Sequence, residues 1–174
     1  DGDGDRVRKL IADSPGVDVL PGRPARLVAT LPSTARPGER VRLCLALLDA
    51  RANAGLAVDA RLDFPEKPGA LGLPDELVLT PADLGRKTIE INLTEPATYR
   101  LRVRAEIGEQ VLEAQSNPCL VAASGPRVLW GDLHGHSALS DGTGTPEDYY
   151  SYARDVAALD IVALTDHDHW GMLF

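Results

Sequence analysis

Residues 17–123 of this 174-residue chain consist of short apolar and charged stretches that proline and glycine interrupt. In Tyr99–Ile107 the odd positions are apolar or aromatic and the even positions are charged. Successive side chains of a strand point to opposite faces, so this period of two is typical of a strand with one solvated face. We expect strands at 25–31, 39–49, 56–64, 87–93, 98–107 and 119–122, with turns at 36–38, 65–69 and 108–109. Because no helical pattern separates them, they predict a mainly β fold, an antiparallel β-sandwich of immunoglobulin-like size.

The pattern changes after residue 123. The apolar run 128–130 leads into a first histidine-containing run, Gly131–Ser137. Thr145 followed by Pro146 and acidic residues predicts a helix start, and apolar residues at helical spacing extend that helix to about residue 158. A buried strand at 160–164 then precedes a second such run, 165–170. The pattern of the C-terminal segment therefore predicts one β-α-β unit.

These patterns divide the chain into four parts: a flexible N-terminal segment (1–16), the β-sandwich domain (17–123), a linker (124–127) and a C-terminal metal-binding segment (128–174). The start Asp1-Gly-Asp-Gly-Asp5 resembles the opening of a calcium loop. Such loops carry a glutamate at position 12, where this chain has Ala12, so a flexible tail is the better interpretation.

Charge is unevenly distributed along the chain. From Trp130 onward, eight acidic residues face one basic residue, Arg154, so this part carries −7 of the net charge of −8. An acidic surrounding of histidines suits a multivalent cation and disfavours a nucleic-acid surface. No apolar run is long enough to span a bilayer, so we expect no membrane partner and a soluble protein, either cytoplasmic or exported after removal of a leader. Cys44 and Cys119 are expected to be buried thiols, with a disulfide between them left open.

All four histidines lie between residues 134 and 169, next to several carboxylates. Residues two apart in a strand share a face, so His134 and His136 can present both imidazoles to one ion. The strands of a β-α-β unit are parallel, which brings Asp141 and His167 toward them at the same sheet edge. The sequence predicts a metal site from these four residues. Taken singly, each also has an ordinary structural interpretation: histidines can be exposed, and Asp141 in Ser-Asp-Gly-Thr can be a turn residue.

The runs that carry the histidines resemble a known family. Asp132–Gly142 together with Leu164–Asp168 is similar to the first two motifs of the PHP (polymerase and histidinol phosphatase) superfamily, in a branch with an N-terminal β-sandwich. The resemblance implies the first β-α-β unit of a (β/α)₇ barrel and two or three divalent metals (Zn, Mn or Fe). It implies that His134 and His136 bind one metal and that Asp141 and His167 bind another. Asp166, Asp168 and His169 are implied only as possible orienting residues behind the ligands, and no catalytic residue is assigned.

From this resemblance we expect the intact protein to be a metal-dependent hydrolase, a phosphoesterase that acts on a small-molecule phosphate ester through metal-activated water. The chain carries too few ligands for several metals, so we expect a truncated, inactive fragment with partial or no metal occupancy. Its exposed strands are expected to promote burial on the sandwich or self-association, through Ile161, Val162, Leu164, Trp170 and Leu173. Two alternatives remain open. The sandwich can be a binding or interaction module beside a vestigial or structural metal site, or the metals can serve an amidohydrolase-like reaction.

Overall fold

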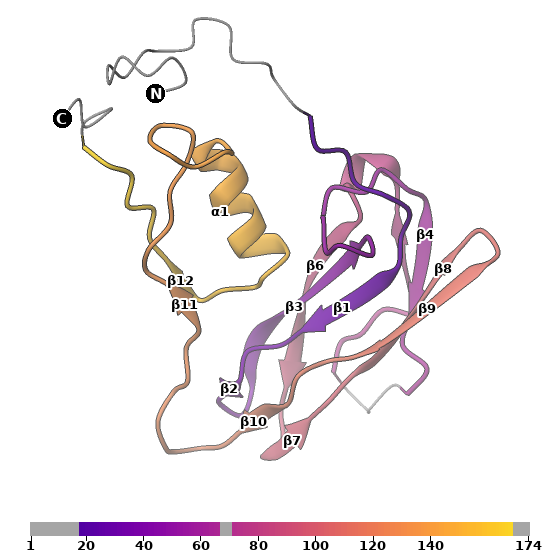
Figure 1. Ribbon diagram of the computed structural model, residues 1–174. Coiled ribbons are helices and arrows are strands. Elements are labelled where there is room, and N and C mark those ends of the chain that lie inside the picture. The colour runs from indigo at the N-terminus through magenta and orange to yellow at the C-terminus, as the bar shows by residue number, and fades with distance from the viewer. Residues whose placement is uncertain (1–17, 67–70, 169–174) are drawn as a thin grey trace, which may run out of the picture.

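The fold is a β-sandwich with a small helical extension, described by a computed structural model for residues 18–66 and 71–168 (Figure 1). One sheet has the order β1-β3-β6 and is antiparallel; its strands are β1 (Arg26–Thr30), β3 (Glu39–Leu48) and β6 (Arg86–Leu93). The other has the order β5-β4-β8-β9 and is also antiparallel; its strands are β5 (Glu76–Leu79), β4 (Ala60–Asp63), β8 (Arg102–Ile107) and β9 (Gln110–Gln115). A short 3₁₀ turn, η1 (Pro81–Asp83), precedes β6.

A third, smaller sheet closes one end of the sandwich. Its strands are β2 (Thr34–Ala35), β10 (Cys119–Val121) and β7 (Ala97–Tyr99). β10 pairs antiparallel with β7 and parallel with β2, so the sandwich is not wholly antiparallel.

A single apolar core joins the two large sheets. Alternate residues of β3, among them Leu43, Leu45 and Leu47, are at most 1% exposed, and they share one cluster with Leu62 of β4 and Val103 of β8. This inward alternation is what the period of two in the sequence predicts. The mainly β, sandwich-type fold is therefore confirmed.

The structure divides one expected strand and adds two large-sheet strands that the sequence pattern did not predict. The expected strand at 98–107 is split into β7, which pairs with β10, and β8, which pairs with β4 and β9. At the break, Leu101 donates its backbone N–H to the buried Ser116 hydroxyl at 3.0 Å. β9 is the return strand of a hairpin whose turn, at Gly108-Glu109, the sequence did predict. β5 pairs with β4 at the edge of the second sheet.

The C-terminal part forms a small parallel pair with a helix between its strands. β11 (Gly131–Asp132) pairs parallel with β12 (Ile161–Val162), and α1 (Pro146–Asp155) connects them. Thr145 is the N-cap as predicted: its hydroxyl accepts the backbone N–H of Asp148 at 3.1 Å, and Pro146 takes the first helical position. The helix is shorter than expected, because it ends near Val156 rather than at residue 158.

The helix of this unit packs on the outer face of the β1-β3-β6 sheet (Figure 1). Val156, at the end of α1, forms a second buried cluster with Ala46 and Leu48 of β3. The Arg42 guanidinium donates to the carbonyl oxygen of Arg154 at 3.1 Å. β3 is thus covered on both faces, which explains its continuous apolar run at positions 43–48.

The segment between the two parts is also held to the sandwich. Arg127 makes two hydrogen bonds to the Glu39 carboxylate, at 2.8 and 3.0 Å. These bonds, with Arg36 bound to the same carboxylate through its backbone N–H, lower the pKa of Glu39. The Trp130 indole N–H donates to the Ser33 hydroxyl at 2.7 Å.

Some residues for which the sequence analysis made predictions are not described by the structure. The N-terminal segment 1–16, His169, Trp170 and Leu173 lie outside the described residues. Among the expected contact residues, Ile161 is 47% exposed, whereas Val162 and Leu164 are partly buried. In the described ranges no helix is long and apolar enough to cross a membrane.

The two cysteines are buried free thiols, as expected. Burial raises the pKa of Cys119 to about 11. Cys44 lies under the extension, with its sulfur 3.9 Å from the carbonyl oxygen of Arg154.

Candidate metal centre

The parallel pair β11–β12 brings the two histidine-containing runs together. The first run includes β11 and continues past its end, and the second begins three residues after β12. The strands are in register, with Asp132 opposite Val162. Beyond the pair, the backbone N–H of Thr165 donates to the carbonyl oxygen of Gly135 at 2.7 Å, which extends the contact between the runs. The runs are about thirty residues apart in sequence, so this juxtaposition comes from the parallel topology.

Three of the four predicted ligands form one cluster. One possible ligand atom from each of His136, Asp141 and His167 lies within 4.8 Å of the others. The rings of His136 and His167 have centroids 4.6 Å apart, and Oδ2 of Asp141 lies 3.8 Å from Nε2 of His167. Bonds from zinc to nitrogen are about 2.0–2.1 Å, so an ion would have to draw these atoms slightly closer together.

The Asp141 carboxylate orients the His136 ring. Nδ1 of His136 lies 2.5 Å from Oδ1 of Asp141, and this hydrogen bond is the main cause that lowers the pKa of the Asp141 carboxyl. A carboxylate can only accept, so Nδ1 of His136 is the donor in this contact. In the described part of the chain, the buried Nε2 of His136 has no hydrogen-bond partner. An ion shared with Asp141 would instead be bound by Nδ1, in place of the proton that now lies between Nδ1 and the carboxylate.

His134 lies beside the cluster but is oriented by a different group. Its ring centroid is 4.9 Å from that of His136, and its Nδ1 is 3.0 Å from the Thr165 hydroxyl. The same hydroxyl is 3.2 Å from the carbonyl oxygen of Gly135, to which only the hydroxyl can donate. The Thr165 hydroxyl thus lies between Nδ1 of His134 and the Gly135 carbonyl oxygen, and the contact with Nδ1 orients the His134 ring.

Asp166 is turned away from the cluster and into the loop that carries Asp141. It accepts the backbone N–H and the hydroxyl of Ser137, both at 2.7 Å, and the hydroxyl of Ser140 at 2.6 Å. These bonds, with that of Ser140 the largest, lower the pKa of Asp166. Asp168 is exposed, and His169 lies outside the described residues.

Two glycines permit the close packing of these runs. A Cβ at Gly142 would collide with the carbonyl oxygen of His136, around which the loop turns. A Cβ at Gly135 would collide with the ring of Tyr149 of α1.

Sequence reasoning did not single out Tyr149 or Asp132, although both lie near the site. Burial, followed by the nearby Asp132 charge, raises the pKa of Tyr149.

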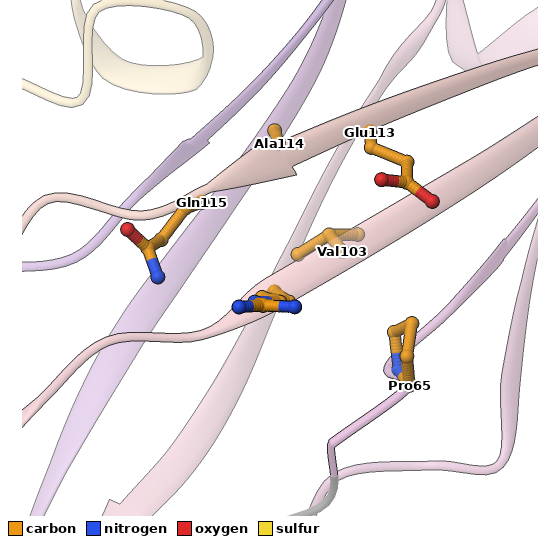
Figure 2. Close-up of a pocket in the computed structure, with 6 residues that line it drawn as sticks. Pro65, Val103, Glu113, Ala114 and Gln115 are labelled. Atoms are coloured by element: carbon orange, nitrogen blue, oxygen red, sulfur yellow. The ribbon is translucent and has the colours of Figure 1, made fainter.

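The cavity shown in Figure 2 lies elsewhere on the molecule. It has a volume of about 340 Å³ and is lined by Pro65 and by residues of β8 and β9, including Arg102 and Glu113. Figure 1 shows these strands on the side of the sandwich away from β11 and β12. None of the predicted metal ligands lines this cavity.

Sequence comparison finds similar stretches in uncharacterised proteins of two Chlamydia species. An uncharacterised protein from Chlamydia muridarum (strain MoPn / Nigg) is 32% identical over 74 residues, 42% of this chain and 12% of that protein. An uncharacterised protein from Chlamydia trachomatis serovar D has the same identity and coverage. The match thus spans about an eighth of these relatives' length. No protein-family model matches the chain.

Similar solved structures are distant. The superoxide reductase (neelaredoxin) from Ignicoccus hospitalis has a TM-score of 0.39 at 8% identity, over 57% of this chain and 82% of that one. The sulfur carrier protein SoxY from Chlorobium limicola f thiosulfatophilum gives 0.38 at 15% identity, over 55% and 78%. The D00-D0 domain of intimin gives 0.36 at 13% identity, over 56% and 48%. Likeness at this level assigns neither a relative nor an activity.

These comparisons correct the resemblance to the PHP superfamily. The motif-based assignment is wrong, because no family model matches the chain. The described residues contain one parallel pair of two-residue strands with a helix between them, which defines no barrel. A His-X-His pair and an Asp-His pair are short patterns that arise wherever polar loops follow two neighbouring strands. What the fold does define is a β-sandwich module with a β-α-β extension.

Proposed function

We propose that this chain is a β-sandwich binding module that holds a divalent metal ion on its β-α-β extension. The observation that carries the proposal is the cluster of His136, Asp141 and His167, with possible ligand atoms within 4.8 Å of one another. Nδ1 of His136, 2.5 Å from Oδ1 of Asp141, lies on the side of the Asp141 carboxylate and can bind the ion once it has lost its proton. Two imidazoles and a carboxylate suit zinc, manganese or iron.

The acidic surroundings support the choice of a cation. The extension carries most of the net negative charge of the chain, and a bound cation would offset part of it. Three protein ligands are also the number typical of a zinc site that keeps one position open for water or a partner. A second or third metal would need ligands beyond these three residues, with His134 as the nearest further group.

Metal analysis tests this proposal. After dialysis against zinc, manganese or iron and removal of loosely bound ions, the protein is expected to retain about one ion per chain. His136→Ala and His167→Ala should each abolish retention. Glu147→Gln, which removes one charge from an exposed side chain of α1, should retain the metal. Equal metal content in wild type and both histidine variants would contradict the proposal.

A second candidate function is metal-dependent hydrolysis by a metal-bound water. The observation that favours it is access: the side chains of Asp141 and His167 are 66% and 46% exposed, so a substrate such as a small phosphate ester can reach an ion held there. A bound divalent metal lowers the pKa of its water to about 7, which supplies hydroxide at neutral pH. Metal-loaded protein should then hydrolyse a generic phosphate ester, and His136→Ala should not. Retention of metal without turnover of any ester would leave the binding module as the function.

A further inference from the structure

Ser137, Ser140 and Asp166 form a buried polar network, which we call the serine–aspartate lock. The Asp166 carboxylate accepts three hydrogen bonds of 2.6–2.7 Å from the two serines. Ser137 and Ser140 are only 1% and 6% exposed. Hydrogen bonds to a charged acceptor are among the stronger ones in proteins, so this network fixes its members firmly.

Each member of the lock is the immediate sequence neighbour of a candidate metal ligand. The three neighbouring pairs are His136 with Ser137, Asp141 with Ser140, and His167 with Asp166. One carboxylate therefore ties together the backbones that carry all three ligands. The lock spans both histidine-containing runs, since Asp166 follows β12 and the serines follow β11.

Hydrogen bonds to Ser137 close the loop that carries Ser140 and Asp141. The carbonyl oxygen of Ser137 accepts the backbone N–H groups of Ser140 and Gly142, at 3.0 and 2.9 Å. The Ser137 hydroxyl also accepts the backbone N–H of Leu139 at 3.1 Å. Asp141 lies inside this closed turn, so its position is set by Ser137 and, through Ser137, by Asp166.

We propose that the serine–aspartate lock is the positioning element of the metal site, and that Asp166 acts through it without touching the ion. This inference rests on the proposed metal binding and adds the residues that determine its strength. A site whose ligands are already held close together loses little conformational freedom when an ion binds. Without the lock, the Asp141 loop and the run after β12 would have to be ordered by the ion itself.

The experiment measures zinc affinity and the visible absorption of bound cobalt for wild type, Asp166→Asn, Ser140→Ala and the control Glu147→Gln. Asp166→Asn keeps the size of the side chain but removes the charge and one acceptor oxygen. Groups that orient metal ligands typically change affinity by about 10–100-fold, and that loss is expected for Asp166→Asn. Ser140→Ala should give a smaller loss, with the control unchanged. The cobalt spectrum should broaden in the lock variants because the ligand geometry is less uniform.

The metal-free unfolding midpoint separates positioning from general stability. A purely structural role would lower this midpoint while leaving the zinc affinity of the folded protein unchanged, and that result would overturn the inference. Should Asp166→Asn fail to fold, Ser140→Ala decides, because it removes only one hydroxyl, which contacts Asp166 at 2.6 Å and Asp141 at 3.5 Å. If both lock variants bind zinc as tightly as the wild type, the lock is refuted and the metal site stands. Absence of zinc binding in the wild type instead refutes the metal site on which the inference rests.

Discussion

Val156→Ala is expected to destabilise the whole molecule, because this side chain joins the extension to the sandwich. Val156 is 5% exposed and packs with Ala46 and Leu48 on the outer face of the β1-β3-β6 sheet. The substitution removes two buried methyl groups, each equivalent to about 0.8 kcal/mol of burial. The remaining cavity adds to this loss, so the free energy of unfolding should fall by roughly 2 kcal/mol. For a chain of this size that corresponds to a fall of roughly 4–8 °C in Tm.

Urea denaturation followed by two probes checks both the magnitude and the coupling. Trp130 lies where the extension meets the sandwich, with its indole bonded to Ser33, so its fluorescence reports on that junction, whereas far-UV circular dichroism is dominated by the sandwich. The two midpoints should shift together in Val156→Ala. The matched control is Val128→Ala at a position that is 42% exposed, where a change within about 0.5 kcal/mol is expected. A fluorescence shift with an unchanged dichroism midpoint would refute the idea that docking of α1 stabilises the sandwich.

Three further changes test the cap, the turn and the junction. Thr145→Ala should cost about 1 kcal/mol in urea denaturation through loss of the helix N-cap, and a Thr145→Ser variant should recover most of it. Gly142→Ala should strongly weaken zinc binding in a calorimetric titration, because the added Cβ collides with the His136 carbonyl oxygen; unchanged affinity would contradict the tight turn. The pKa of Glu39 is lowered in the folded state, so its pairing with Arg127 stabilises the protein above pH of about 4.5 and is lost as the pH falls through the lower folded-state value. Glu39→Gln should therefore flatten the dependence of Tm on pH in this acidic range, and parallel profiles would refute the assignment.

The sandwich could be predicted from the sequence because its strands carry their own signal. Period-two alternation in Tyr99–Ile107 depends only on which side chains face the core, and the structure confirms inward positions such as Val103 and Ala105. The split between β7 and β8 could not be predicted, since it depends on pairing with distant segments, β10 for β7 and β4 and β9 for β8. Likewise β5 is a four-residue edge strand whose existence depends on its partner β4.

The docking of α1 left a sequence signal that an alternation rule overlooks. Positions 43–48 of β3 are apolar without interruption, and this pattern indicates a strand covered on both faces. Such a run indicates that the second face of β3 is covered, but it does not identify the covering element. The identity of the cover, Val156 and its neighbours on α1, follows only from the three-dimensional arrangement.

The period-two rule for strands does not predict where the ligands of the candidate site lie. The expectation that His134 and His136 share a strand face applies only within a strand, and β11 ends at Asp132. Past that point the loop sets the directions: it turns His136 toward Asp141 and His167, while Thr165 orients His134. The parallel topology, in contrast, was a correct basis for bringing Asp141 and His167 toward His136. The position of each ligand therefore depends on the serine–aspartate lock, whose members look like ordinary loop residues in the sequence. Metal affinity in this chain is therefore expected to depend on that lock as much as on the histidines.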